Sequence, residues 1–190
     1  DLGIGFEDGW SSTTLTLAGL VTGAGELYLH QYSDVTLTND NNSFTGGTYL
    51  SSGSALHVAT DHALGPGPLS FGYSGGTVYF GSAAPVVGGL FARENDYGSL
   101  KLAMNDAVLT VNQSTDGMFL GEVRADNLAN PTHNDSIRLV KNGAGSLLLA
   151  QGGLYYYNAP VEATLPGSPQ VSLQINQGTV ELGRNFYIEN

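Results

Sequence analysis

Short runs in which apolar and polar residues alternate recur along the whole chain. Such runs are typical of β-strands that bury one face. Nearly every gap between them contains Gly, Asn, Asp or Pro, which favour turns. The pattern therefore predicts strands at 14–17, 26–29, 35–37, 56–58, 77–80, 99–102, 108–111, 118–120, 136–140, 146–149, 171–175 and 179–182.

Helix is the minority expectation. No long window keeps an apolar period of about 3.6 residues. The best candidate, residues 58–64, is short and ends at Gly65-Pro66. We expect at most one helical turn there, because proline and glycine interrupt helices.

Internal repetition favours a solenoid over a sandwich or barrel. Residues 20–29 and 139–149 each run from a predicted strand through Gly-Ala-Gly into a second strand. Residues 75–80 and 177–182 each enter a strand directly from glycine. Reuse of one unit predicts stacked coils, and with roughly twenty residues in each coil the chain would form about eight to ten.

These phrases resemble the autotransporter-associated β-strand repeat of large exported bacterial surface proteins. Residues 20–80 resemble it closely, with Gly23-Ala24-Gly25, an Asn-rich stretch that closes in Phe44-Thr45-Gly46-Gly47-Thr48, and Ala63-Leu64-Gly65. A second, more divergent copy covers about 137–182. In that copy Tyr155-Tyr156-Tyr157-Asn158-Ala159-Pro160 replaces the Phe-Thr-Gly-Gly-Thr phrase.

The resemblance implies an all-β fold, a right-handed, single-stranded parallel β-helix. We expect residues 1–190 to form one segment of a longer chain, exported and displayed on the bacterial outer membrane. Its implied function is structural or adhesive and not enzymatic, with host glycans, matrix or neighbouring surface proteins as partners. The resemblance assigns no catalytic, cofactor-binding or metal residue.

Charge and composition make several classes of partner and of stabilising site unlikely. The 190 residues hold six basic and seventeen acidic side chains, a formal charge of −11. This balance disfavours nucleic acid and anionic membrane surfaces as partners. The absence of cysteine excludes disulfides and thiolate metal sites. No apolar run is long enough for a membrane helix, and the first residues do not form a signal peptide.

Histidines offer one candidate metal site. His30, His57 and His62 could converge with Asp34 or Asp61 if coils stack. No recognised metal-binding spacing accompanies them, so we expect surface or corner positions.

A polysaccharide lyase or hydrolase of β-helical fold is the alternative function. Such chemistry needs clustered carboxylates, sometimes with calcium and a basic group. Arg93 and Lys101 are among the few basic residues. The candidate acids, which we expect mostly to be solvated turn residues, are Glu94, Asp96, Asp106, Asp116 and Asp126.

A carbohydrate-binding module is a third interpretation. Tyr155, Tyr156 and Tyr157 could stack on sugar, although alternation along a strand would bury at least one ring. Trp10 could cap or pack on the first coil. The run Asn39-Asp40-Asn41-Asn42 lacks the pattern of a calcium loop, and we expect a turn or an asparagine ladder.

Overall fold

The described part of the chain consists of β-strands joined by turns and loops. The computed structural model describes residues 1–4, 13–51, 53–72, 75–92, 101–104, 106–125, 136–150, 153–156, 171–183 and 187–188. No helix forms in these ranges, and hence none that is long and apolar enough to cross a membrane. The expected all-β class is confirmed.

The strands form four sheets, and every strand pair in the described ranges is parallel. Sheet A has the order β1 (Leu2–Ile4), β3 (Leu27–Leu29), β5 (Thr48–Leu50), β7 (Leu69–Phe71) and β10 (Leu90–Ala92). Sheet B has the order β2 (Thr13–Leu17), β4 (Ser33–Leu37), β6 (Ser54–Val58), β8 (Gly76–Phe80), β11 (Lys101–Met104), β14 (Glu122–Ala125), β17 (Gly153–Tyr156) and β20 (Tyr187–Ile188).

Two further sheets are formed by strands that follow residue 85. Sheet C has the order β18 (Val171–Ile175), β15 (Ile137–Asn142), β12 (Ala107–Asn112) and β9 (Val86–Val87). Sheet D has the order β13 (Gly117–Phe119), β16 (Ser146–Leu149) and β19 (Thr179–Leu182).

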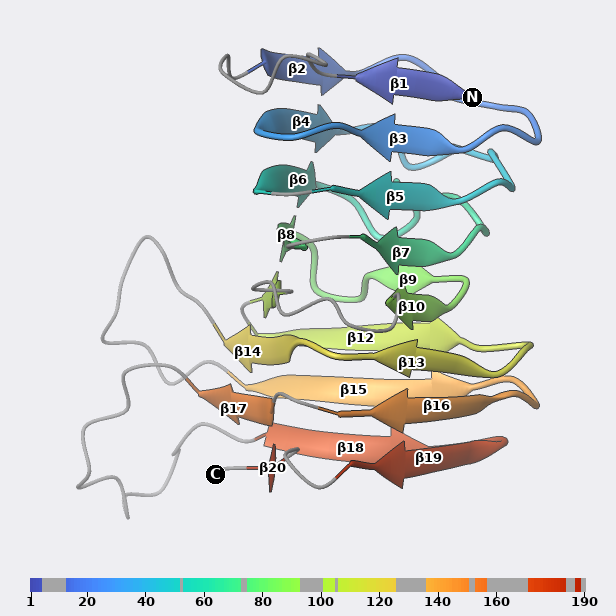
Figure 1. Ribbon diagram of the computed structural model, residues 1–190, viewed down its shortest axis with the longest axis vertical. Helices are drawn as coiled ribbons and strands as arrows, with labels where there is room; N and C mark the ends of the chain where they lie inside the picture. The colour runs from blue at the N-terminus through green and yellow to red at the C-terminus, as the bar shows by residue number, and fades with distance from the viewer. Residues whose placement is uncertain are drawn as a thin grey trace.

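Consecutive strands alternate between sheets, so neighbours within a sheet come from successive rounds of the chain. We call each round, which contributes one strand to sheet B, a tier. Figure 1 shows the tiers one above another, with β1 and β2 at one end and β18, β19 and β20 at the other. The sheets therefore grow along one axis as the sequence proceeds.

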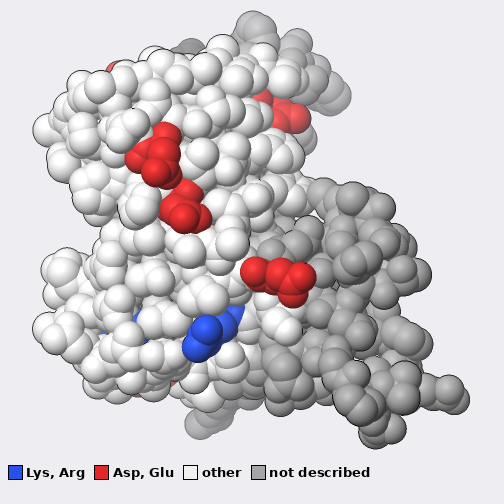
Figure 2. Space-filling view, turned by 180° about the vertical axis from the view of Figure 1, so that it is seen from behind, with Lys and Arg blue, Asp and Glu red and all other residues white. Residues whose placement is uncertain are grey.

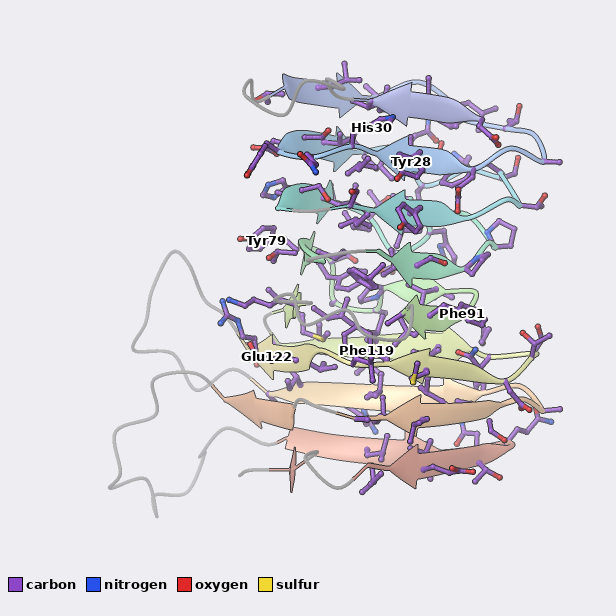
Figure 3. The ribbon with its side chains drawn as sticks, viewed as in Figure 1. Tyr28, His30, Tyr79, Phe91, Phe119 and Glu122 are labelled. Atoms are coloured by element: carbon purple, nitrogen blue, oxygen red, sulfur yellow. The ribbon has the colours of Figure 1, made fainter. Side chains whose placement is uncertain are left out.

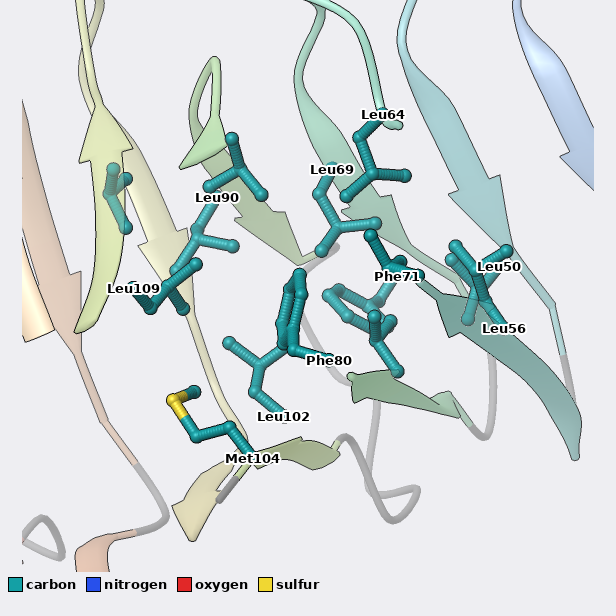
Figure 4. Packing of buried hydrophobic residues seen from close by; sticks show 14 of the residues in the cluster. Leu50, Leu56, Leu64, Leu69, Phe71, Phe80, Leu90, Leu102, Met104 and Leu109 are labelled. Carbon is teal, nitrogen blue, oxygen red and sulfur yellow. The ribbon is translucent and has the colours of Figure 1, made fainter. Parts of the chain in front are cut away.

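The core consists of side chains that lie at the same strand position in successive tiers. In sheet B the register places Val35, Leu56, Val78, Leu102 and Val123 in one such column. All five are buried. Strands β4, β6 and β8 share the same alternation of buried and half-buried residues, because side chains of a strand point to opposite faces. Figure 4 shows leucines and phenylalanines of neighbouring tiers packed between the sheets.

Apolar side chains become exposed where this stacking ends. Leu2 and Leu15 in the first tier are 46% and 36% exposed, and Ile175 and Leu182 in the last tier are 48% and 52% exposed. Their counterparts in adjacent tiers, such as Leu27 and Leu149, are buried. Burial at these four positions therefore depends on a neighbouring tier on each side.

Each strand predicted from alternation overlaps an observed one, although residues 99 and 100 lie outside the described residues. No predicted range covers β1, β5, β7, β9, β10, β14, β17 or β20, each of which has only two to four residues. Such short strands display little or no period. The segment 61–66 forms a turn, which is consistent with the expectation of at most one helical turn.

The expected strand at Leu20–Thr22 is wrong. Leu20 is exposed, and the Val21 N–H donates to the Asn42 side-chain Oδ1 at 2.9 Å rather than to a strand neighbour. The Ser43 N–H in turn donates to the Val21 carbonyl. This side of the molecule is built from stacked turns until β9 begins sheet C.

Asn42 connects three tiers, and its removal tests how much these turns depend on it. The buried side chain accepts from the Val21 N–H and donates from Nδ2 to the Ala63 carbonyl at 2.8 Å. We expect Asn42→Ala to lower the free energy of unfolding by about 2–4 kcal/mol, because one buried and one partly buried backbone group lose their partners. Urea denaturation measures the change. Asn41→Ala, an exposed neighbour, should change stability by less than about 0.5 kcal/mol, and equal effects of the two variants would contradict the expectation.

Thr48 is a buried polar residue whose replacement should raise the stability of the chain. It lies in a buried column between Leu27 and Leu69, and its hydroxyl oxygen has no hydrogen-bond partner among the described residues. Valine has the same shape without the polar atom. We expect Thr48→Val to raise the free energy of unfolding by about 1 kcal/mol, since it removes an unsatisfied buried group. Loss of stability in thermal denaturation would show that the hydroxyl is satisfied.

Candidate functional site

Aspartates at the turns bind the backbone of the next tier. The Asp61 Oδ1 accepts from the Ala84 N–H at 3.0 Å, and the Asp40 Oδ1 accepts from the His62 N–H at 2.9 Å. Asp106 and Asp116 do the same for Ser136 and Ser146, at 2.7 and 2.8 Å. These carboxylates therefore cap backbone donors that the ladders leave free.

The two described acids of the enzyme alternative, Asp106 and Asp116, thus have structural partners. A hollow of about 270 Å³ lies beside Asp106, and Arg138 and Ser172 also line it. Asp106 is the single acidic residue in that lining. The other candidates, Glu94, Asp96 and Asp126, lie outside the described residues, as does Arg93.

The three candidate histidines do not come together as the metal hypothesis requires. His57 Nε2 lies 3.3 Å from the Asp34 Oδ1, and His62 Nδ1 lies 3.5 Å from the Asp40 Oδ1. His30 instead packs its ring against Tyr28, with centroids 4.5 Å apart. Among the described residues no group of three or more histidines and carboxylates could hold a metal ion.

The surroundings of Asp40 favour its ionised form. The hydrogen bond from the His62 backbone N–H is the largest cause that holds the pKa of Asp40 below its usual value, and burial opposes it. The charged form is thus favoured in the folded chain.

Asparagine side chains form a ladder, but away from the predicted run. Asn142 Nδ2 donates to the Asn112 Oδ1 at 3.3 Å, and Asn176 Nδ2 donates to the Asn142 Oδ1 at 2.8 Å. The predicted run forms a turn, as expected.

Lys141 occupies a buried column where its neighbours are apolar. The residue is fully buried. Its Nζ donates to three backbone carbonyl oxygens, those of Asn142, Gly143 and Gln177, at 2.9, 2.8 and 3.2 Å. Burial lowers the pKa of this amine. Since Gln177 belongs to the last tier, the ammonium joins that tier to the preceding one.

Aromatic rings cluster on the outer face of sheet A. The register places Tyr28, Tyr49, Ser70 and Phe91 in one outward column. The rings of Tyr28 and Tyr49 are stacked, with centroids 4.6 Å apart and planes at 20°. Figure 3 shows Tyr28 on β3 and Phe91 on β10. A second stack, Tyr79 on His57, belongs to sheet B.

A hollow of about 290 Å³ opens beside this column, between Tyr49 and Phe91. The remaining lining residues are Glu26, Ser70, Phe71 and Ala92. The cluster was not predicted from the sequence, because its members come from four tiers. The signal that could have found it is the repeated central residue of Leu27-Tyr28-Leu29 and Thr48-Tyr49-Leu50.

The tyrosine run chosen from the sequence is described only in part. Tyr155 and Tyr156 belong to β17, where Tyr155 is in register with Arg124. Tyr157 and Trp10 lie outside the described residues.

Among the described residues, charged side chains are sparse on the face opposite to that of Figure 1. Figure 2 shows a few acidic and basic groups there among uncharged residues.

Comparisons of the chain with protein-family models, curated proteins and solved structures gave no match. The resemblance to the autotransporter-associated repeat therefore rests on the sequence phrases alone.

The buried amine of Lys141 should make the free energy of unfolding depend on pH. Because burial lowers its pKa in the folded chain, the unfolded chain binds more protons between that lowered value and the ordinary 10.5. The free energy of unfolding should therefore rise with pH in this window. We expect the stability of the native chain relative to Lys141→Met to increase as pH approaches 10.5, measured by urea denaturation. Lys101→Met, on the outer face, is the matched control, and a pH-independent difference for Lys141→Met would contradict the assignment.

Proposed function

We propose that the chain is a right-handed parallel β-helix that serves as a non-catalytic structural and adhesive segment of a secreted, surface-displayed, autotransporter-like protein. The eight strands of sheet B would then correspond to eight coils. With about 4.8 Å between neighbouring strands, seven steps would carry the chain roughly 34 Å along its axis. Such a segment extends and displays whatever it is attached to.

The observation that carries this proposal is the use of polar side chains to join tiers. Asp61, Asp106 and Asp116 accept backbone hydrogen bonds from the next tier, and Asn42 and Lys141 join neighbouring tiers from buried positions. An enzyme that cleaves polysaccharides needs carboxylates free to act as acid, base or nucleophile. The aspartates that the structure describes at these turns instead accept hydrogen bonds that join one tier to the next.

An adhesive surface also fits the charge distribution. The formal charge of −11 arises from few groups spread over many tiers. Uncharged surface between the charged groups of the described residues favours contacts with neutral partners, and the net negative charge repels anionic surfaces.

The experiment that tests this proposal measures attachment of the chain to surfaces and, in parallel, cleavage of polysaccharides by the chain. Beads coated with the purified chain are applied to glycan-coated and matrix-coated surfaces, and released reducing ends are measured on the same polysaccharides. We expect attachment without release. Asp106→Asn and Asp116→Asn keep a side-chain oxygen for the Ser136 and Ser146 N–H groups but remove the carboxylate, so attachment and stability should be nearly unchanged. Release of reducing ends by the native chain would overturn the non-catalytic function in favour of a polysaccharide-active enzyme, and its loss in either variant would assign the reaction to that aspartate.

A further inference from the structure

The outer face of sheet A carries a gap in its aromatic column. Tyr49, Ser70 and Phe91 are in register on β5, β7 and β10. At about 4.8 Å for each tier, the two aromatic residues are separated by roughly 9.6 Å along the axis. Ser70, the small residue between them, leaves the hollow of about 290 Å³.

Two glycines allow the rings to lie along the sheet. A Cβ on Gly72 would overlap the Tyr49 hydroxyl, so the Tyr49 ring reaches across β7 only because residue 72 has no side chain. A Cβ on Gly89 would lie 2.9 Å from Cε2 of Phe91. The Phe91 ring therefore rests against the backbone beside the hollow. Tyr49 is largely covered, and Phe91 is half-buried.

Polar groups at the hollow are available to a ligand. Neither the Glu26 carboxylate nor the Ser70 hydroxyl forms a hydrogen bond or ion pair within the part of the chain that the structure describes. The Glu26 carboxylate can accept two or more hydrogen bonds, and the Ser70 hydroxyl can both donate and accept.

We propose that this hollow binds a sugar ring of a neutral glycan. The negative face of the Phe91 ring attracts the C–H groups of a pyranose, while sugar hydroxyls donate to Glu26 and bond to Ser70. The volume lies just below the roughly 300–1,000 Å³ of small-molecule pockets, which fits one sugar ring. The inference deepens the proposed function and rests on it, because it gives the adhesive role a site and a ligand class.

Other occupants fit the hollow less well. An acidic glycan would meet the Glu26 carboxylate and the net charge of −11, and none of the described residues that line the hollow is basic. A second copy docked by two-fold symmetry would bring its own Glu26 to the same surface. An extended peptide cannot add a strand here, because β5 and β7 already pair on both edges.

The test uses the whole chain with defined probes. Cellohexaose, mannohexaose and xylohexaose are titrated in saturation-transfer NMR and calorimetry, with hexagalacturonate as the acidic comparison. We expect saturable binding of at least one neutral oligomer and none, or at least tenfold weaker binding, of the acidic one. Absence of binding to every neutral oligomer, or equal binding of hexagalacturonate, overturns the inference.

Substitutions then place the site. Phe91→Leu keeps an apolar side chain without a ring, and Ser70→Tyr fills the hollow on an outward strand position that accepts aromatics. Each should weaken binding at least tenfold, with circular dichroism unchanged. Tyr79→Ala, which removes an outward ring of sheet B, is the matched control and should leave affinity unchanged. Binding that survives both Phe91→Leu and Ser70→Tyr overturns the assignment of the site.

The outcomes also separate this inference from the proposed function. Sedimentation of the free chain reports self-association. If the chain forms a dimer that Phe91→Leu dissociates, the hollow is a contact between two copies of the chain and the glycan inference is overturned. If beads still attach without releasing reducing ends while the hollow binds no oligomer, the inference fails and the adhesive function stands. Release of reducing ends by the native chain would overturn the proposed function itself, even if oligomers bind in the hollow.

Discussion

In-register hydrogen bonding between parallel strands of successive tiers is the constraint on which the rest of the structure depends. Because the register aligns strand positions between tiers, an inward residue such as Leu56 lies between Val35 and Val78. Each tier buries the apolar groups of its neighbours, and none can form a core alone. The turns must therefore keep the register, and Asn42 and the bridging aspartates supply hydrogen bonds that do so.

This constraint also determines where polar chemistry can occur. Inward columns exclude water, so a polar group there needs partners, as Lys141 finds in three carbonyl oxygens. Outward columns are free to vary without affecting the ladder. On sheet A that freedom places Tyr28 and Tyr49 in a stack and leaves a gap at Ser70. The proposed binding surface and the buried core thus lie on opposite faces of the same strands.

The sequence predicted the features that depend on local alternation. Strands such as β4, β6 and β8 alternate clearly, and the repeated phrases indicated stacked units, which parallel pairing supports. Contacts between residues of different tiers could not be predicted. Asp40 could not be matched to His62, nor Tyr49 to Phe91, because the lengths of the intervening turns set the register. The glycines at 72 and 89 acquire meaning only once the rings are placed.

The corner between sheets B and C tolerates very different lengths of chain. Only residues 105 and 106 separate β11 from β12, whereas residues 126–136 separate β14 from β15. Even so, β12 and β15 pair without a break from Ala107 and Ile137 to Asn112 and Asn142. The entropic cost of closing a connection between two strands grows only slowly with the number of residues in it. This corner is therefore a natural graft point, where a foreign epitope or an evolutionary insertion could be added without disturbing the ladder on either side.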